Sequence, residues 1–264
     1  MSPPSFSLVK WYMDCVTGEG DTVILYCAEL HWRGLHAAYS NLLSAIDSQA
    51  TSRSSMGRYR IECEDGRIAV ELPRLQVEGE WKSAAAAVQE TVFPGPDGTS
   101  PDGSALWECL QPQATVRVQL GQRELTGLGY LERLTLTLPP WQLPLRELRW
   151  GRFVSPTDHV IWIDWQGPYS TAFAIHNGCK RRLELVTETE VAIESGTLRM
   201  SDSLPLRAGR LGATVLPGAP MLRRLLPRSL GNIEEHKWRS RGVLETASGQ
   251  SEGWVIHEVV HWKV

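Results

Sequence analysis

Glu132 is the residue of this sequence best placed for acid–base chemistry, because its neighbours in a strand would be apolar. If residues 128–138 form one strand, alternate side chains share a face. The face of Glu132 then carries Leu128, Tyr130, Leu134, Leu136 and Leu138. A carboxyl group among leucines has a raised pKa unless it is paired, and it could act as a general acid. The alternative is a structural ion pair. Arg152 is then the expected partner, since it shares a face with Trp150 on a nearby strand.

Asp14 is the second candidate acid or base. In Lys10-Trp-Tyr-Met-Asp14, strand alternation places Tyr12 and Asp14 on one face, with Trp11 and Met13 on the other. The carboxyl group of Asp14 could therefore be an acid, a base or a satisfied group of the core.

The segment His257-Glu-Val-Val-His261 matches the HExxH pattern of zinc proteases letter for letter. That chemistry needs a helix, in which side chains four residues apart can reach one zinc ion. Residues 254–262 are instead β-branched and aromatic, which predicts a strand. Histidines four residues apart in a strand are about 13 Å from each other, too far for one metal ion. We therefore predict a strand with Glu258 on the face opposite the histidines, where it could line a site, and no metal or cofactor.

The elements that would position these residues are strands. Period-2 alternation runs through 115–120, 133–138 and 190–193, and Asn177-Gly178 is a strong hairpin signal. Long helical patterns between strands, which a parallel sheet requires, are lacking. The sequence predicts an all-β, mainly antiparallel fold with little helix, as barrels or sandwiches, divided into domains 1–122 and 123–264.

Composition excludes several classes of protein. The 264 residues carry a formal charge of −3, so no bulk attraction to nucleic acid or anionic membranes is encoded. No stretch approaches the roughly 18 apolar residues of an integral membrane segment, and no secretory signal is recognisable. The five cysteines are scattered, which is typical of reduced, mostly buried thiols in a cytoplasmic protein. A homo-oligomer is left open.

Two further features concern possible binding sites. The 11 tryptophans suit an aromatic-lined cavity. The segment 204–228 is rich in proline and arginine and has no periodicity. Its arginines are Arg207, Arg210, Arg223, Arg224 and Arg228. They could bind anions, but because the whole chain is slightly acidic we interpret them as the solvated face of a loop.

Four short motifs together resemble a known family. They are Lys10-Trp-Tyr-Met-Asp14, Gly129-Tyr-Leu-Glu132, Trp150-Gly-Arg152 and the segment from Trp254 to Trp262. In their order and aromatic content the chain resembles the lipocalin-like proteins related to carotenoid 1,2-hydratase (hydroxyneurosporene synthase), the AttH-like proteins and tocopherol cyclase. Family members often have Glu-Trp where this chain has Val9-Lys10. The aromatic and Asn or Trp residues that usually follow the glutamate are replaced by 134–138, an alternation of leucine and threonine.

The resemblance implies two lipocalin-like β domains packed together around a pocket for an isoprenoid- or polyketide-like ligand. It implies a hydratase, cyclase or isomerase without a redox cofactor, with Glu132, or else Asp14, as the catalytic acid. Side chains expected to contact the hydrophobic substrate are Trp11, Tyr12, Tyr130, Trp150, Arg152, Trp162 and Glu258. Two alternatives stay open: a non-catalytic binding protein for a lipophilic ligand, and a structural partner in a biosynthetic assembly.

Overall fold

The computed structural model describes residues 6–96, 103–214 and 231–262, and most of them lie in antiparallel strands. The first sheet runs in the order β4-β3-β2-β1-β10-β9-β7-β6-β5, and β8 pairs with β9. Its strands are β1 (Phe6–Val16), β2 (Thr22–Trp32), β3 (Leu35–Ile46), β4 (Gln49–Met56), β5 (Arg60–Glu64), β6 (Arg67–Leu72), β7 (Val77–Ser83), β8 (Val88–Phe93), β9 (Ala105–Leu120) and β10 (Arg123–Leu136).

The second sheet runs in the order β14-β13-β12-β11-β19-β18-β17-β16-β15. Its strands are β11 (Glu147–Val154), β12 (His159–Gln166), β13 (Thr171–His176), β14 (Cys179–Arg181), β15 (Leu183–Val186), β16 (Glu190–Ile193), β17 (Gly196–Arg210), β18 (Glu234–Thr246) and β19 (Gly249–His261). Helix in the described residues is confined to α1 (Leu211–Thr214) and two 3₁₀ turns, Pro73–Leu75 and Pro140–Gln142. The predicted all-β fold with little helix is confirmed.

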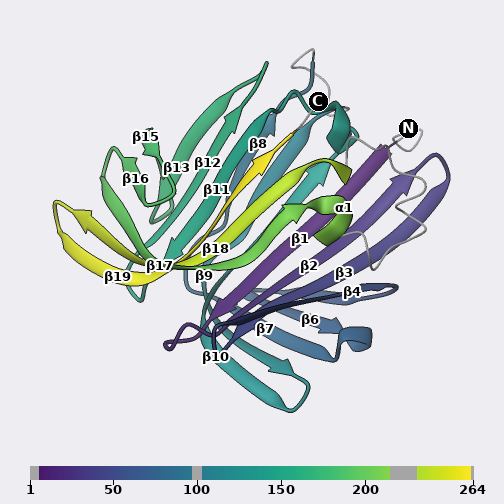
Figure 1. The fold of residues 1–264 in the computed structure, drawn as a ribbon, viewed down its shortest axis with the longest axis horizontal. Helices are drawn as coiled ribbons and strands as arrows, with labels where there is room; N and C mark the ends of the chain where they lie inside the picture. The colour runs from purple at the N-terminus through teal and green to yellow at the C-terminus, as the bar shows by residue number, and fades with distance from the viewer. Residues whose placement is uncertain (1–5, 97–102, 215–230, 263–264) are drawn as a thin grey trace.

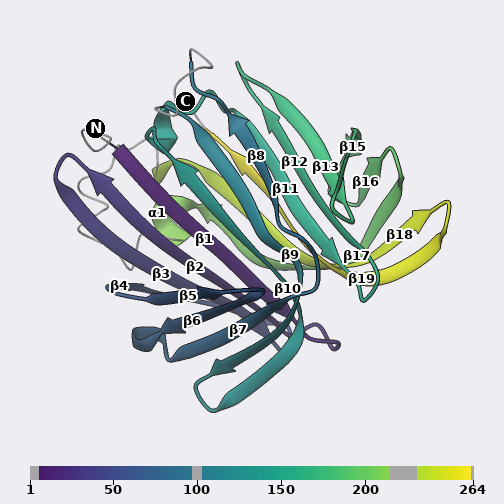
Figure 2. The same ribbon diagram turned by 180° about the vertical axis from the view of Figure 1, so that it is seen from behind.

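The two sheets follow the same path. In each, the first strand of the half pairs with the last, β1 with β10 and β11 with β19, and the remaining strands follow outward on either side. Figures 1 and 2 show both sheets strongly curled and lying side by side. The chain passes from one sheet to the other between Leu136 and Glu147. The predicted domain boundary at residue 122 lies earlier, in the turn between β9 and β10.

Strand alternation divides the interior into three apolar cores. Along β1, Met13 and Cys15 enter a core enclosed by the first sheet, whereas Tyr12 and Val16 point to the opposite side. A second enclosed core forms inside the second sheet. The third core contains residues of both sheets and joins the two halves. The face of β1 and β10 that carries Tyr12 and Tyr130 is therefore buried between the sheets.

Three further sequence predictions concern a hairpin, the cysteines and membrane-spanning helices. The Asn177-Gly178 hairpin joins β13 and β14, and both residues have the positive φ, 49° and 77°, that such a tight turn requires. Cys15, Cys27 and Cys109 are buried, while Cys63 and Cys179 are exposed. In the described residues, no helix has the length and apolar character needed to cross a membrane.

The interpretation of 204–228 as a loop is wrong over its first part. Residues 204–210 belong to β17, and Arg207 is buried, whereas Arg210 at the strand end is exposed. Register shifts between Ser201 and Leu204 and between Pro205 and Arg207 interrupt the alternation, which hides the strand from a periodicity analysis. Arg223, Arg224 and Arg228 lie outside the described residues.

Candidate functional site

A cavity of about 330 Å³ lies between the two sheets. Its walls combine side chains from β1, β2, β3 and β10 with side chains from β11, β12, β17, β18 and β19. Most lining residues are apolar, among them Leu8, Leu30, Leu134, Leu136, Trp141, Leu148, Trp165 and Trp262. The polar lining residues are Lys10, Tyr26, Tyr39, Asn41, Arg207, Glu235 and Glu258. An apolar chamber with a few convergent polar groups is typical of a small-molecule site.

Glu132 is buried on the face of β10 that also carries Leu134 and Leu136, two residues of the cavity wall. The indole Nε1 of Trp107 and the hydroxyl of Tyr130 both donate hydrogen bonds to Glu132 Oε2, the second at 2.7 Å. Burial raises the pKa of this carboxyl group, and the hydrogen bonds from the two neutral donors oppose the rise only in part. Glu132 is therefore held toward its protonated form, as the sequence predicts for an acid among leucines.

Glu258 is a second buried carboxyl group, and it lines the cavity itself. Its Oε2 accepts a hydrogen bond from the ammonium group of Lys237, which is 1% exposed. Burial would raise the pKa of Glu258, but Lys237 outweighs that effect, and the pKa lies below its ordinary value. Burial acts on Lys237 in the opposite sense, yet the surrounding carboxylates raise its pKa overall. The Glu258–Lys237 pair is therefore ionised.

The two acids occupy corresponding positions in the two halves of the molecule. Glu132 on β10 is the cross-strand partner of Tyr12 on β1, and Glu258 on β19 is the partner of Trp150 on β11. Because β1–β10 and β11–β19 are the corresponding strand pairs of the two sheets, carboxyl groups whose pKa values are shifted in opposite directions stand at equivalent sites.

Arg152 does not pair with Glu132, contrary to the sequence-based expectation. Its Nε and Nη2 donate to the two oxygens of Asp14, at 3.0 and 2.6 Å, and its Nη1 donates to the carbonyl oxygen of Trp254 at 2.7 Å. Asp14 and Arg152 each stand two residues before the end of the first strand of their half, so the packing of the two sheets brings them together. The ion pair is fully buried and joins the sheets, and neither residue lines the cavity.

The predicted aromatic residues fall into two groups. Tyr12, Tyr130 and Trp150 contact one another edge to face, with ring centroids 5.0–6.0 Å apart, in the core between the sheets. Trp11 packs against the core inside the first sheet, beneath the guanidinium of Arg133, and Trp162 lies inside the second sheet. The structure thus brings Tyr12, Tyr130, Trp150 and the two glutamates together and separates Trp11 and Trp162 from them.

Sequence reasoning missed several polar residues of the cavity, namely Lys10, Tyr26, Glu235 and the adjacent Lys237, and it interpreted the buried Arg207 as solvated. One signal could have found Lys237. The turn between Thr246 and Gly249 sets the register of the last hairpin, and following that register back along both strands places Lys237 opposite Glu258.

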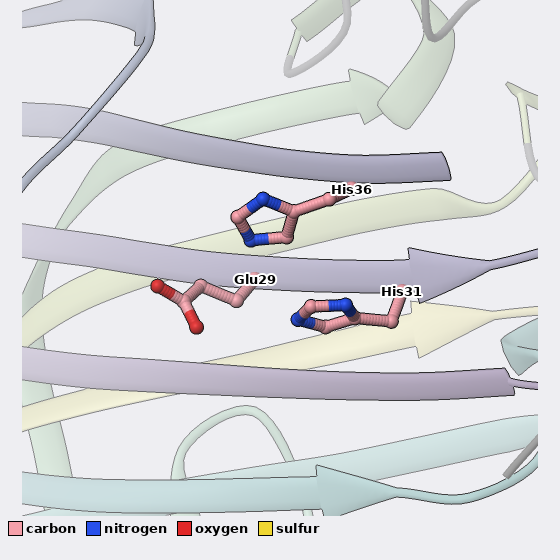
Figure 3. A group of neighbouring side chains, drawn as sticks. All are labelled: Glu29, His31 and His36. Carbon is pink, nitrogen blue, oxygen red and sulfur yellow. The ribbon is translucent and has the colours of Figure 1, made fainter. Parts of the chain in front are cut away.

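The prediction of no metal rested on the spacing of the C-terminal histidines. Those two residues do lie on a strand: His257 Nε2 is 3.0 Å from the hydroxyl of Ser240, and His261 Nδ1 is 3.3 Å from Glu147. Elsewhere, the hairpin between β2 and β3 brings Glu29, His31 and His36 together on an exposed surface, with one potential ligand atom from each within 4.8 Å of the others (Figure 3).

The imidazoles of His31 and His36 are cross-strand neighbours and stack with centroids 4.4 Å apart. Two nitrogens and a carboxylate could hold a divalent transition-metal ion whose other positions are taken by water. Alternation along β2 points Ala28 and Leu30 into the cavity and Glu29 and His31 away from it. A metal bound by Glu29 and the two histidines would therefore be outside the cavity.

Comparison with known proteins establishes the fold. No family model matches the chain, and no curated protein matches it in sequence. Among solved structures, kievitone hydratase from Nectria haematococca superposes with a TM-score of 0.58 at 13% identity, covering 100% of this chain and 92% of the hydratase. An AttH-like protein from Nitrosomonas europaea gives a TM-score of 0.60 at 10% identity, over 98% and 93%. The structure of CghA with Sch210972 gives 0.55 at 9% identity, over 98% and 89%. The resemblance to the lipocalin-like hydratase and AttH proteins is thus confirmed for the fold, which consists of two lipocalin-like halves.

Proposed function

We propose that the protein is a hydratase, cyclase or isomerase that acts without a redox cofactor on a hydrophobic isoprenoid- or polyketide-like molecule in the cavity. One observation supports the proposal: Glu132, whose pKa is raised by burial, and Glu258, whose pKa is lowered by Lys237, occupy equivalent positions of the two corresponding strand pairs. Enzymes that use acid–base catalysis commonly have two acids whose surroundings shift their pKa values in opposite directions. The similarity in fold to kievitone hydratase and CghA supports the proposal.

In a hydration, the two glutamates would act as proton donor and proton acceptor. Glu132 transfers its proton to one carbon of an alkene, and the π electrons form the new C–H bond. Water adds to the resulting cation, and Glu258 takes the proton that this water loses. Exchange with solvent returns a proton to Glu132 and removes one from Glu258, so the net change is one added water. Tyr12 and Trp150 are the cross-strand partners of the two acids, and the ammonium group of Lys237 lies 5.4 and 5.3 Å from their ring centroids. In a cyclase or isomerase, an internal alkene or loss of a proton would replace the water.

Isotope-labelled water tests this proposal directly. The wild-type protein is incubated in ¹⁸O water with a panel of prenylated and polyketide alkenes, and products are examined by mass spectrometry for labelled oxygen or for isomers of unchanged mass. We expect product from the wild type and a loss of at least about 100-fold in Glu132→Gln, which cannot donate the proton as an acid. Glu124→Gln on the same strand is the matched control, because Glu124 is exposed and paired with Arg117. Full turnover by Glu132→Gln would refute the role of this acid.

A second candidate function is binding without chemistry. The observation that favours it is that both hydrogen bonds to Glu132 come from the protein, while the walls of the cavity are mainly apolar. In that case the same panel quenches the fluorescence of the tryptophans that line the cavity, Trp141, Trp165 and Trp262, and no product forms.

A further inference from the structure

Buried hydrogen-bond donors that line the cavity lack acceptors. Tyr26 Oη, Arg207 Nε and Trp165 Nε1 are shielded from solvent and have no hydrogen-bond partner within the described part of the chain. Tyr26 is 7% exposed and Arg207 8% exposed. A buried donor without an acceptor is costly, and native proteins rarely leave one so. The cavity is therefore prepared for a ligand that brings acceptor oxygens.

The charges around Tyr26 point in the same direction. Three cations surround its ring: Lys10 Nζ and Lys237 Nζ at 5.1 and 5.9 Å from the centroid, and Arg207 Cζ at 5.2 Å. Two carboxyl groups face these cations. Glu235 Oε2 lies 3.4 Å from Arg207 Nη1, and Glu258 is bonded to Lys237.

Lys10 is the cation left over. Within residues 6–96, 103–214 and 231–262, no carboxylate lies within ion-pair distance of its ammonium group, although the side chain lines the cavity. The third acid nearby, Glu132, is hydrogen-bonded to Trp107 and Tyr130 and not to Lys10. The half-buried ammonium group of Lys10 therefore has no carboxylate bonded to it at the edge of an apolar chamber, where a direct anionic partner would be favourable.

We propose that the ligand of the cavity is an amphiphilic monocarboxylate, whose carboxylate is bound by Lys10, Tyr26 and Arg207. The inference rests on the proposed function, in which this cavity takes a lipophilic molecule, and it specifies the polar end of that molecule. A single negative charge balances Lys10, whereas a doubly charged phosphate would leave an excess negative charge in the cavity. The two carboxylate oxygens accept hydrogen bonds from the ammonium group, the phenol and the guanidinium Nε. The apolar chain lies against the leucines and tryptophans of the wall.

A pair of probes with the same chain and different ends tests the inference. Dodecanoate and dodecanol are titrated at neutral pH and fixed ionic strength, with tryptophan fluorescence and calorimetry as readouts. We expect the wild-type protein to bind dodecanoate at least about tenfold more tightly than dodecanol, the strength of a charge-assisted hydrogen bond. Lys10→Met, which keeps the length of the side chain, is expected to abolish this preference without weakening dodecanol. Lys10→Arg, which keeps the charge, is expected to retain it.

Lys180→Met is the matched control, because Lys180 is exposed and paired with Glu90 away from the cavity lining. Equal affinity for both probes would overturn the inference and leave the cavity as a lipophile site. A preference that survives in Lys10→Met would overturn the role of Lys10. Binding of neither probe would contradict both the inference and the proposed function.

Discussion

Glu132 and Glu258 stand opposite the central aromatic residues of the two halves, Tyr12 and Trp150, yet only Glu258 is bonded to a lysine. The same strand pairing therefore presents two carboxyl groups whose pKa values are shifted in opposite directions. The difference comes from the neighbouring strand of each half, since the residue beside Glu132 on β9 is Cys109 and the residue beside Glu258 on β18 is Lys237. A change at residue 237 should consequently act on the second acid first, and on Glu132 only through the charge of Glu258.

The first prediction concerns Lys237. Replacing it in Lys237→Met removes the cation that is bonded to Glu258 and one of the two cations near Glu235. We expect the free energy of unfolding to fall by about 3–5 kcal/mol, as when one partner of a buried ion pair is removed. Urea denaturation measures the change.

Lys82→Met serves as its control, since Lys82 is exposed and paired with Glu80, and such surface pairs contribute about 1 kcal/mol or less. A loss at residue 237 no larger than that of the control would show that the buried pair is not ionised.

The second prediction concerns the pH dependence that follows from Glu132. Its pKa in the folded protein is raised by burial, so the folded state holds this proton at pH values where the unfolded chain has lost it. Between the ordinary glutamate pKa of about 4.3 and the raised value, the free energy of unfolding should decline as pH rises. Activity that needs the acid should disappear over the upper part of the same window. Glu132→Gln removes this contribution, so the wild-type and variant stability curves should differ in slope only within that range. Parallel curves would show that the pKa is not raised.

The buried face of β10 is the part of the site that the sequence predicts. Alternation alone placed Tyr130 and Glu132 on the buried face, and the hydrogen bond between them confirms it. The prediction survived because the register shifts beside these residues lie in the partner, β9, which has the extra residues, and leave the alternation of β10 intact.

Arg152 shows where such reasoning stops. Strand alternation assigns a residue to one face of its sheet. It carries no information on which residue of another sheet will lie against that face. Asp14 and Arg152 are 138 positions apart and meet only because the two sheets dock with their corresponding strands together. Arg207 was assigned to a solvated loop for a different reason, since register shifts within its own strand interrupt the pattern.

The third prediction concerns acid stability. His159 and His257 are buried, and burial lowers the pKa of each from 6.5 to about 4. Because the unfolded chain binds these protons first, the free energy of unfolding should fall as pH decreases from 6.5 to 4, by about 3 kcal/mol or less for each histidine. The stability curve of His257→Gln should be flatter over this range than that of the wild type. Titration of the His257 ring by NMR near pH 6.5 in the folded protein would contradict the prediction.

The last prediction concerns the ion pair that joins the two sheets. Asp14 and Arg152 are both shielded from water, and the guanidinium donates to both carboxylate oxygens. Arg152→Met would leave a buried carboxylate with no cation, so we expect it to lower the free energy of unfolding by about 3–5 kcal/mol. The double variant Asp14→Leu with Arg152→Met buries no charge and should recover much of that loss, because well-packed apolar side chains often replace a buried ion pair at little cost. The four proteins of this cycle are compared by urea denaturation, with Arg117→Met as the surface control. If the double variant were as unstable as the sum of the single ones, the two side chains would be uncoupled, and the sheets would be joined by the apolar core between them alone.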